Sequence, residues 1–159
     1  MKTSTLSLST LVIFVGLLSN ALAVTWSSNF VQADINTLTP MVKNIQTCLS
    51  AQNYGAAYDI LGNKGTKKLV AFGKTKLIYT KQDFIHAFAS YKQYGEPKFN
   101  FDSAKLLSAR SASSYQMTVD GTITVSLPVS IKFNANIIFT GANPVVGEVK
   151  SAIFTLNFG

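Results

Sequence analysis

The chain has 159 residues, with one cysteine, one histidine and only 13% charged residues. This length fits one compact domain, and 47% hydrophobic with 11% aromatic residues argues against intrinsic disorder. The formal net charge of +7 makes the chain basic and leaves anionic partners open. One histidine and one cysteine are too few for a typical zinc site, so we expect no metal and no cofactor. Cys48 alone cannot form an intramolecular disulfide.

The N-terminal segment has the pattern of a secretory signal peptide. Lys2 precedes the apolar run Leu11–Leu18, which is too short to cross a bilayer comfortably. Ala21-Leu22-Ala23 then forms a small-x-small cleavage pattern. We therefore expect residues 1–23 to be removed and residues 24–159 to form a single secreted, extracellular domain.

Three segments show the spacing of amphipathic helices. The first is expected from Thr39, as N-cap before Pro40, and the second continues over Ala51–Leu61 until a Gly-rich turn ends it. The third begins with a capping box in Thr80–Asp83. Its apolar residues follow at i, i+4 and i+7, as Phe84, Phe88 and Tyr91. Residues 69–79 suggest a small hairpin or an extended connection between the second and third helices.

After the third helix the periodicity changes to two. Between Tyr115 and Phe139 the apolar residues occupy odd positions, which is typical of antiparallel strands with one face on a core. This shared parity argues against a two-residue hairpin at Asp120-Gly121 and favours a bulge or a three-residue loop. Reversals are expected at Leu127–Val129 and Gly141–Pro144. The apolar residues of the last strand are Ala152, Phe154, Leu156 and Phe158.

Three local patterns accompany this order of elements: Ala51–Tyr58 before the second helix, Asp83-Phe84 in the capped helix, and the closing strand Glu148–Phe154. Together with the element order, they resemble the nuclear transport factor 2-like (SnoaL-like) superfamily. The resemblance covers most of residues 24–159. It implies an α+β fold with three N-terminal helices packed on a strongly curved, mostly antiparallel sheet, a cone-like, cystatin-like roll. It also implies an apolar pocket at the open end of the cone and a homodimer through the sheet. A cystatin-like or lipocalin-like fold is the alternative.

The many aromatic residues, without an evident catalytic group, favour a secreted, non-enzymatic domain that binds an apolar small molecule. We expect the pocket for this ligand to be lined by Phe84, Phe88, Tyr91, Tyr115, Met117, Ile131, Phe133 and Ile137. The same residues could instead fill a packed core, and the sequence does not separate a hollow interior from a filled one.

A second hypothesis is a protein-interaction module with a basic face. Lys67, Lys68, Lys74 and Lys76 lie in residues 64–81, which contain six lysines and no acid. Such a face would suit an anionic glycan, lipid or protein surface, whereas export argues against nucleic acid. Lysines that only keep the surface soluble are the simpler interpretation.

A third hypothesis is an isomerase-like or dehydratase-like enzyme, because the superfamily contains both. Proton abstraction beside a carbonyl needs a carboxylate base and a hydrogen-bond donor in an apolar pocket. Among the acidic residues, Asp59 is the best candidate for the base, with Tyr58 or Tyr115 as the hydrogen-bond donor. His86 is the other candidate acid or base, although its helical position opposite the aromatic edge predicts a solvent-facing side chain.

Overall fold

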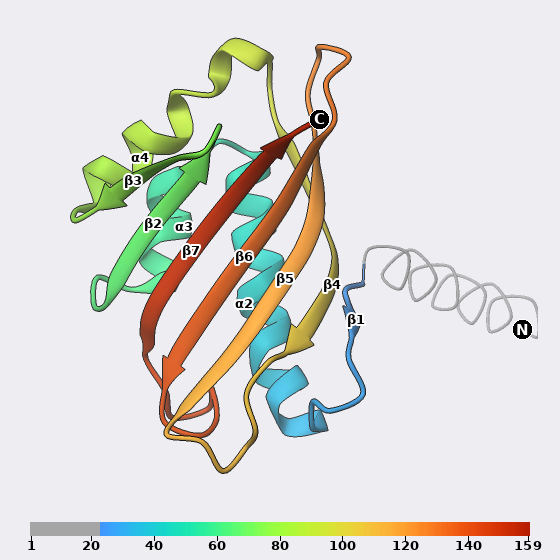
Figure 1. Cartoon of the computed structure of the whole chain (residues 1–159), viewed down its shortest axis with the longest axis vertical. Coiled ribbons are helices and arrows are strands. Elements are labelled where there is room, and N and C mark those ends of the chain that lie inside the picture. Colours follow the sequence, from blue (N-terminus) through green and yellow to red (C-terminus); the bar gives the residue numbers. More distant parts are fainter. Residues whose placement is uncertain (1–22) are drawn as a thin grey trace, which may run out of the picture.

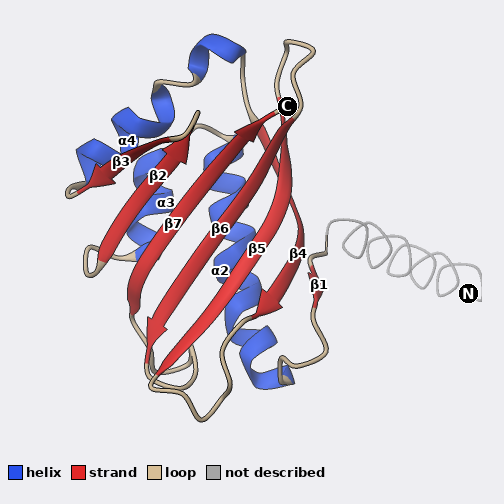
Figure 2. Ribbon diagram, in the orientation of Figure 1, coloured by secondary structure: helices blue, strands red, loops and turns tan. Residues whose placement is uncertain are grey.

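The computed structural model describes residues 23–159, so the predicted signal peptide lies outside the described residues except for Ala23. Helices pack on one face of a twisted sheet (Figures 1 and 2). The helical elements are α2 (Gln32–Ser50), α3 (Tyr54–Leu61), α4 (Lys81–Ala89) and the short 3-10 helix η1 (Lys92–Tyr94). The strands are β1 (Thr25–Trp26), β2 (Thr66–Ala71), β3 (Lys74–Ile78), β4 (Lys98–Leu106), β5 (Ser114–Thr124), β6 (Ile131–Thr140) and β7 (Val149–Phe158).

These strands form one seven-stranded sheet within residues 23–159, in the order β1-β4-β5-β6-β7-β2-β3. Neighbours from β4 to β7 are antiparallel, as are β2 and β3, whereas β7 runs parallel to β2 and β1 parallel to β4. Alternate residues of the central strands are buried, which places one sheet face on the helices and leaves the other open. The predicted α+β fold with a mostly antiparallel sheet is confirmed.

Helix α2 begins at Gln32, about two turns before the predicted start at Thr39. Pro40 lies inside the helix instead of at its first position, and the Thr39 hydroxyl donates to the Ile35 carbonyl at 2.7 Å instead of capping. The helix tolerates the missing proline N–H because its buried face continues on both sides of Pro40. That face consists of Asp34, Leu38, Val42, Ile45 and Leu49.

The other two helices begin where local chemistry dictates. Gln52 has a φ of 58°, which interrupts the helix, so α3 starts at Tyr54 and not at the predicted Ala51. Asn53 caps it by accepting from the Ala56 amide at 3.3 Å. The predicted capping box of α4 is confirmed, with Thr80 and Asp83 each bonding the other's backbone amide. Among residues 23–159, no helix is long and apolar enough to span a membrane.

Strand β5 keeps its parity through Asp120-Gly121, and a β-bulge lies beside these residues. The irregularity lies on the partner strand, where the register of β4 shifts between Phe101 and Ser103, and β5 continues without a turn. Gly121 permits this close approach, because a Cβ there would lie 2.1 Å from the Asn100 carbonyl oxygen. The bulge favoured by the sequence is therefore present, one strand away from the residues that signalled it.

Candidate ligand-binding site

The larger hollow lies at the end of the sheet where the β6–β7 loop meets α2 and α3. Its volume is about 270 Å³, and we call it the basal hollow. Its apolar wall is formed by Leu38, Met41, Ile60, Leu61, Phe139 and Val149. Its polar residues are Thr37, Asn63, Lys64 and Glu148. An apolar wall with a few polar groups at one side suits a small, mostly apolar ligand with one polar end.

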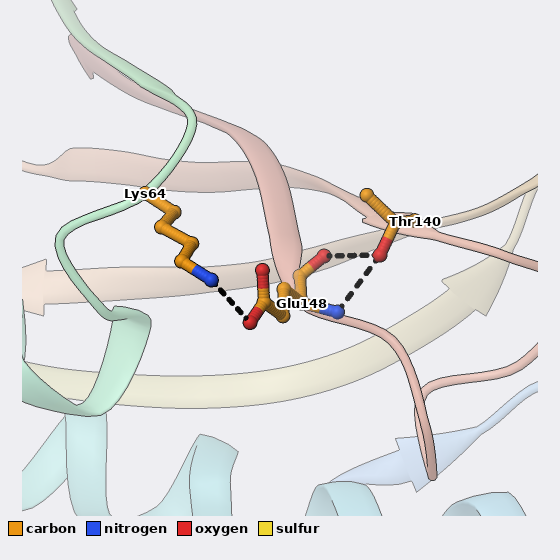
Figure 3. Close-up of polar contacts among 3 residues, drawn as sticks. All are labelled: Lys64, Thr140 and Glu148. Atoms are coloured by element: carbon orange, nitrogen blue, oxygen red, sulfur yellow. Dashed lines mark hydrogen bonds and ion pairs between the residues drawn. The ribbon is translucent and has the colours of Figure 1, made fainter.

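Two oppositely charged residues, Lys64 and Glu148, line the basal hollow, and Figure 3 shows their side chains pointing toward each other. The Lys64 ammonium nitrogen lies 2.9 Å from Oε1 of Glu148, and the two side chains are 70% and 60% exposed. Such an exposed pair contributes little to stability and can exchange its partner for a ligand at small cost. The backbone of Glu148 is fixed independently, because its amide donates to the Thr140 hydroxyl at 3.0 Å and its carbonyl accepts from the Thr140 amide at 2.8 Å.

A second, much smaller hollow lies at the opposite end, beneath η1 and the end of β7. Its volume is about 20 Å³, room for about one water molecule. Of the eight predicted lining residues, only Phe88, Tyr91 and Ile131 border it. The structure therefore leaves almost no free space at the end of the cone where the predicted aromatic residues meet.

The remaining five predicted lining residues border neither hollow. Phe84, Tyr115 and Met117 have no exposed surface, and Phe133 and Ile137 are nearly as buried. The ring centroids of Phe84 and Phe88 are 4.7 Å apart, and those of Phe133 and Phe101 lie 5.1 Å apart in a stacked arrangement. These residues are packed against one another as a core, which is the alternative that the sequence left open.

The four predicted basic-face lysines do not share one surface. Lys67 faces inward because it alternates with Lys68 along β2, and it is only 2% exposed. Its ammonium donates to the Lys64 carbonyl at 2.9 Å and lies 4.9 Å from the centre of the Tyr58 ring, while burial lowers its pKa. Lys67 is therefore not free to bind an external anion.

The other three lysines stay accessible. Lys68 lies half-buried on the open sheet face, and Lys74 and Lys76 are exposed on the edge strand β3. The Lys76 ammonium donates to the Ser90 hydroxyl at 3.3 Å and lies 5.8 Å from the centre of the Tyr91 ring. Lys76 thus lies beside Ser90 and Tyr91, just before η1, and not on a face shared with Lys67.

The candidate catalytic residues are not brought together. Asp59 is exposed and pairs with Lys81 at 2.6 Å, whereas the Tyr58 ring is buried against Phe84. His86 is exposed, as predicted, and its Nε2 lies 2.9 Å from Nε2 of Gln82. No hydrogen bond within residues 23–159 joins Asp59, Tyr58 or His86 to another of the three. Nor does this range contain a cluster of His, Cys, Asp or Glu side chains able to hold a metal ion.

One buried polar cluster was absent from the sequence predictions. Asp34 is buried in the first turn of α2, and the Arg110 guanidinium reaches it from the β4–β5 loop. The nearby Tyr115 hydroxyl is buried without a hydrogen-bond partner, and burial, followed by the negative charge of Asp34, raises its pKa. The available signal was the spacing of Asp34 four residues before Leu38, which places both on one helix face.

No protein-family model matches the sequence, and no curated protein matches it either. Solved structures do match its fold. An NTF2-like protein with a cystatin-like fold from Novosphingobium aromaticivorans is 8% identical, with a TM-score of 0.56 over 78% of this chain and 82% of that chain. A protein of the NTF2-like family from Streptomyces avermitilis is 9% identical, with a TM-score of 0.53 over 80% and 98%.

Mtr2 of Candida albicans, solved in complex with the Mex67 M domain, is 12% identical and has a TM-score of 0.52 over 80% of this chain and 98% of that chain. Identities this low establish a shared fold and carry no activity from one protein to another. The helices, the curved sheet and these neighbours agree with the resemblance seen in the sequence. The chain therefore has the fold of the nuclear transport factor 2-like superfamily, a cystatin-like roll.

Proposed function

We propose that this chain is an exported, non-enzymatic domain that binds a small apolar molecule, and that the ligand occupies the basal hollow. The observation that carries this proposal is the hollow itself, about 270 Å³ of open space beside a core that is otherwise filled. This volume lies just below the range of about 300–1,000 Å³ for small-molecule pockets, which favours a small ligand. In place of the predicted aromatic lining, the proposed ligand would contact the mostly aliphatic wall of the basal hollow.

The rim of the basal hollow favours a ligand with one polar group. Lys64 and Glu148 neutralise each other, so a ligand carboxylate would displace Glu148 and a ligand amine would displace Lys64. The Asn63 amide and the Thr37 hydroxyl offer further hydrogen bonds. An apolar body with a single carboxylate, amine or hydroxyl is the ligand class that these side chains fit.

Native mass spectrometry of residues 24–159, secreted from a eukaryotic host, tests the proposal directly. We expect an additional small mass that is lost on denaturation. Thr37→Tyr places a ring in the hollow and should abolish this mass. Thr39→Tyr is the matched control, because both threonines are exposed on α2 and bond the carbonyl four residues earlier, but only Thr37 lines the hollow.

The outcomes separate the proposal from its competitors. A bare mass for the unmodified protein, or equal loading of both tyrosine variants, would refute the assignment of the ligand to this hollow. Lys64→Met and Glu148→Gln, measured separately, report the charge of the ligand. A ligand carboxylate would pair with Lys64, so only Lys64→Met should lower its affinity. A ligand amine would pair with Glu148, so only Glu148→Gln should lower its affinity.

The open face of the sheet supports a homodimer as a second candidate function. Val70, Ile138 and Ile153 lie half-buried on this face, and no element among residues 23–159 covers it. Gln116 donates to Asn136 at 3.1 Å beside them, so the face mixes aliphatic and satisfied polar groups. Size-exclusion chromatography with light scattering should show a dimer that Ile153→Lys disrupts, whereas a monomer at all concentrations would refute it.

A further inference from the structure

The turn between β2 and β3 carries a phenylalanine where the backbone favours asparagine or glycine. Ala71 pairs with Lys74, so Phe72 and Gly73 form a two-residue turn, and their φ values are 52° and 70°. Two left-handed residues define a type I′ turn, which favours Asn-Gly. A bulky side chain in this conformation is strained, and such strain persists where the side chain serves a purpose.

Phe72 is only partly used by the fold. Its ring stacks on Phe158 with centroids 4.0 Å apart and planes 13° apart, yet the residue remains 55% exposed. Stacking covers part of the ring and leaves more than half of the residue's surface in water. A residue that only capped the core would not need to project a ring face into solvent.

Phe72 belongs to a cluster of aromatic rings with Tyr91, Tyr94 and Phe158, and we call these four residues, together with the exposed Leu127 of the β5–β6 loop, the apolar end. The Tyr94 ring lies 6.2 Å from Phe72 and 5.2 Å from Phe158, centroid to centroid. Gly95, next to Tyr94, packs so closely on Ser126 that a Cβ would lie 2.8 Å from its hydroxyl oxygen. Ser126 precedes the exposed Leu127, so the turns after β2 and β5 form one end of the molecule (Figure 1).

Three exposed lysines lie in β3, η1 and β4, the elements next to this end. Lys74, Lys92 and Lys98 are exposed, and none of them has a carboxylate within ion-pair distance in the part of the chain that the structure describes. Two acids lie in the same stretch, Glu96 between η1 and β4 and Asp102 within β4, and both are exposed. The loop from Val125 to Ser130 has no charge at all. Uncharged tips with exposed lysines in the neighbouring elements suit a surface that is apolar inside and negatively charged outside.

We propose that the apolar end docks the protein on anionic lipid membranes. Phe72 and Leu127 enter the boundary between headgroups and acyl chains, and Tyr91 and Tyr94 lie at headgroup depth, where amphipathic rings are favoured. Lys74, Lys92 and Lys98 then face lipid phosphates and carboxylates. This inference does not depend on the basal hollow, which lies at the opposite end of the sheet.

Vesicle sedimentation tests the proposal with the secreted protein. We expect binding to phosphatidylcholine vesicles containing about a quarter phosphatidylserine, little binding to pure phosphatidylcholine, and weaker binding as salt rises. Phe72→Asn should bind about tenfold more weakly although its turn becomes Asn-Gly and less strained. Leu127→Ser should also weaken binding, whereas Val146→Ser, at an exposed apolar residue on the β6–β7 loop, should not.

A charge pair of variants completes the test. Lys74→Gln should weaken vesicle binding by about fivefold, and Lys43→Gln, which changes net charge equally from the exposed side of α2, should have a smaller effect. Equal binding of the folded Phe72→Asn and Val146→Ser proteins would overturn the proposal. Failure of the unmodified protein to bind anionic vesicles would also overturn the proposal. This holds even if the protein binds an acidic protein or glycan through the same residues.

Discussion

Arg110 donates from Nη2 to Oδ2 of Asp34 across 2.6 Å and joins the β4–β5 loop to the first turn of α2, 76 residues away in sequence. The Asp34 side chain is 2% exposed and that of Arg110 is 44% exposed. The two charged groups depend on this ion pair to different degrees. The Asp34 carboxylate is buried and relies on Arg110 as its partner, whereas the guanidinium also contacts water.

Replacing Arg110 with alanine should lower the free energy of unfolding by about 1–3 kcal/mol, because it leaves a buried carboxylate without its charged partner. Urea titration followed by circular dichroism measures the change. Lys64→Ala is the control, since it breaks the exposed pair with Glu148 and should cost at most about 0.5 kcal/mol. Equal effects of the two substitutions would contradict the structural role assigned to the Asp34 pair.

Tyr115→Phe should leave the protein as stable at neutral pH or raise the free energy of unfolding by about 1 kcal/mol. The substitution removes a buried hydroxyl that has no hydrogen-bond partner and keeps the ring in place. Thermal unfolding at pH 7 measures the difference. A clear loss of stability would show that the hydroxyl makes a bond that this structure does not contain.

The same variant should change the response to alkaline pH. Burial raises the Tyr115 pKa above its unfolded value of about 10, so above this pH the unfolded chain loses a proton that the folded chain keeps. Stability should therefore fall as pH rises, by up to about 1.4 kcal/mol per pH unit from this residue. Urea midpoints at increasing pH should fall less steeply for Tyr115→Phe. Tyr54 and Tyr91, whose pKa values are also raised, remain in both proteins.

Lys67→Ala should reduce the free energy of unfolding by about 1–3 kcal/mol and leave the affinity for anionic vesicles unchanged. Its ammonium is buried, bonds the Lys64 carbonyl and covers the Tyr58 ring, so its role is structural. Lys68→Ala, on the open face of the same strand, should change stability by less than about 0.5 kcal/mol. A Lys67→Ala protein of normal stability and lowered vesicle affinity would restore Lys67 to the basic surface.

Gly121→Ala should destabilise the protein by about 3 kcal/mol or more, or prevent folding. A methyl group there would lie 2.1 Å from the Asn100 carbonyl oxygen, so β4 and β5 would have to separate at the bulge. Thr122→Ala, at the exposed neighbouring position, should stay within about 1 kcal/mol of the original protein. Soluble yield and urea midpoint, compared between the two variants, provide the measurement.

Local chemistry made most elements predictable. The Thr80–Asp83 capping box and the odd parity from Tyr115 to Phe139 each depend on residues that are close in sequence, and both appear in the structure as expected. The start of α2 was missed because Pro40 looks like a first helical residue when only its neighbours are considered. The upstream turn is held by tertiary packing of Asp34 and Leu38, which overrides that local signal.

The basal hollow could not be predicted, because its walls come from α2, α3 and the loop before β7. Met41 and Val149 look like ordinary core residues in the sequence, and no pattern indicates that space remains between them. The lysines of β2 were likewise only partly predictable. Strand alternation places Lys67 and Lys68 on opposite faces, but only the folded structure places the Tyr58 ring beneath the Lys67 ammonium.

The sequence by itself determined the types and order of the elements, the mostly antiparallel sheet and the basic charge, because periodicity, capping and composition are properties of neighbouring residues. Only the tertiary structure decided that the aromatic interior is filled, that a hollow remains at the other end, and that Arg110 meets Asp34. These features depend on volumes and distances between segments that are far apart in the chain. Side chains from several segments pack together to set those distances, so no single segment reveals them.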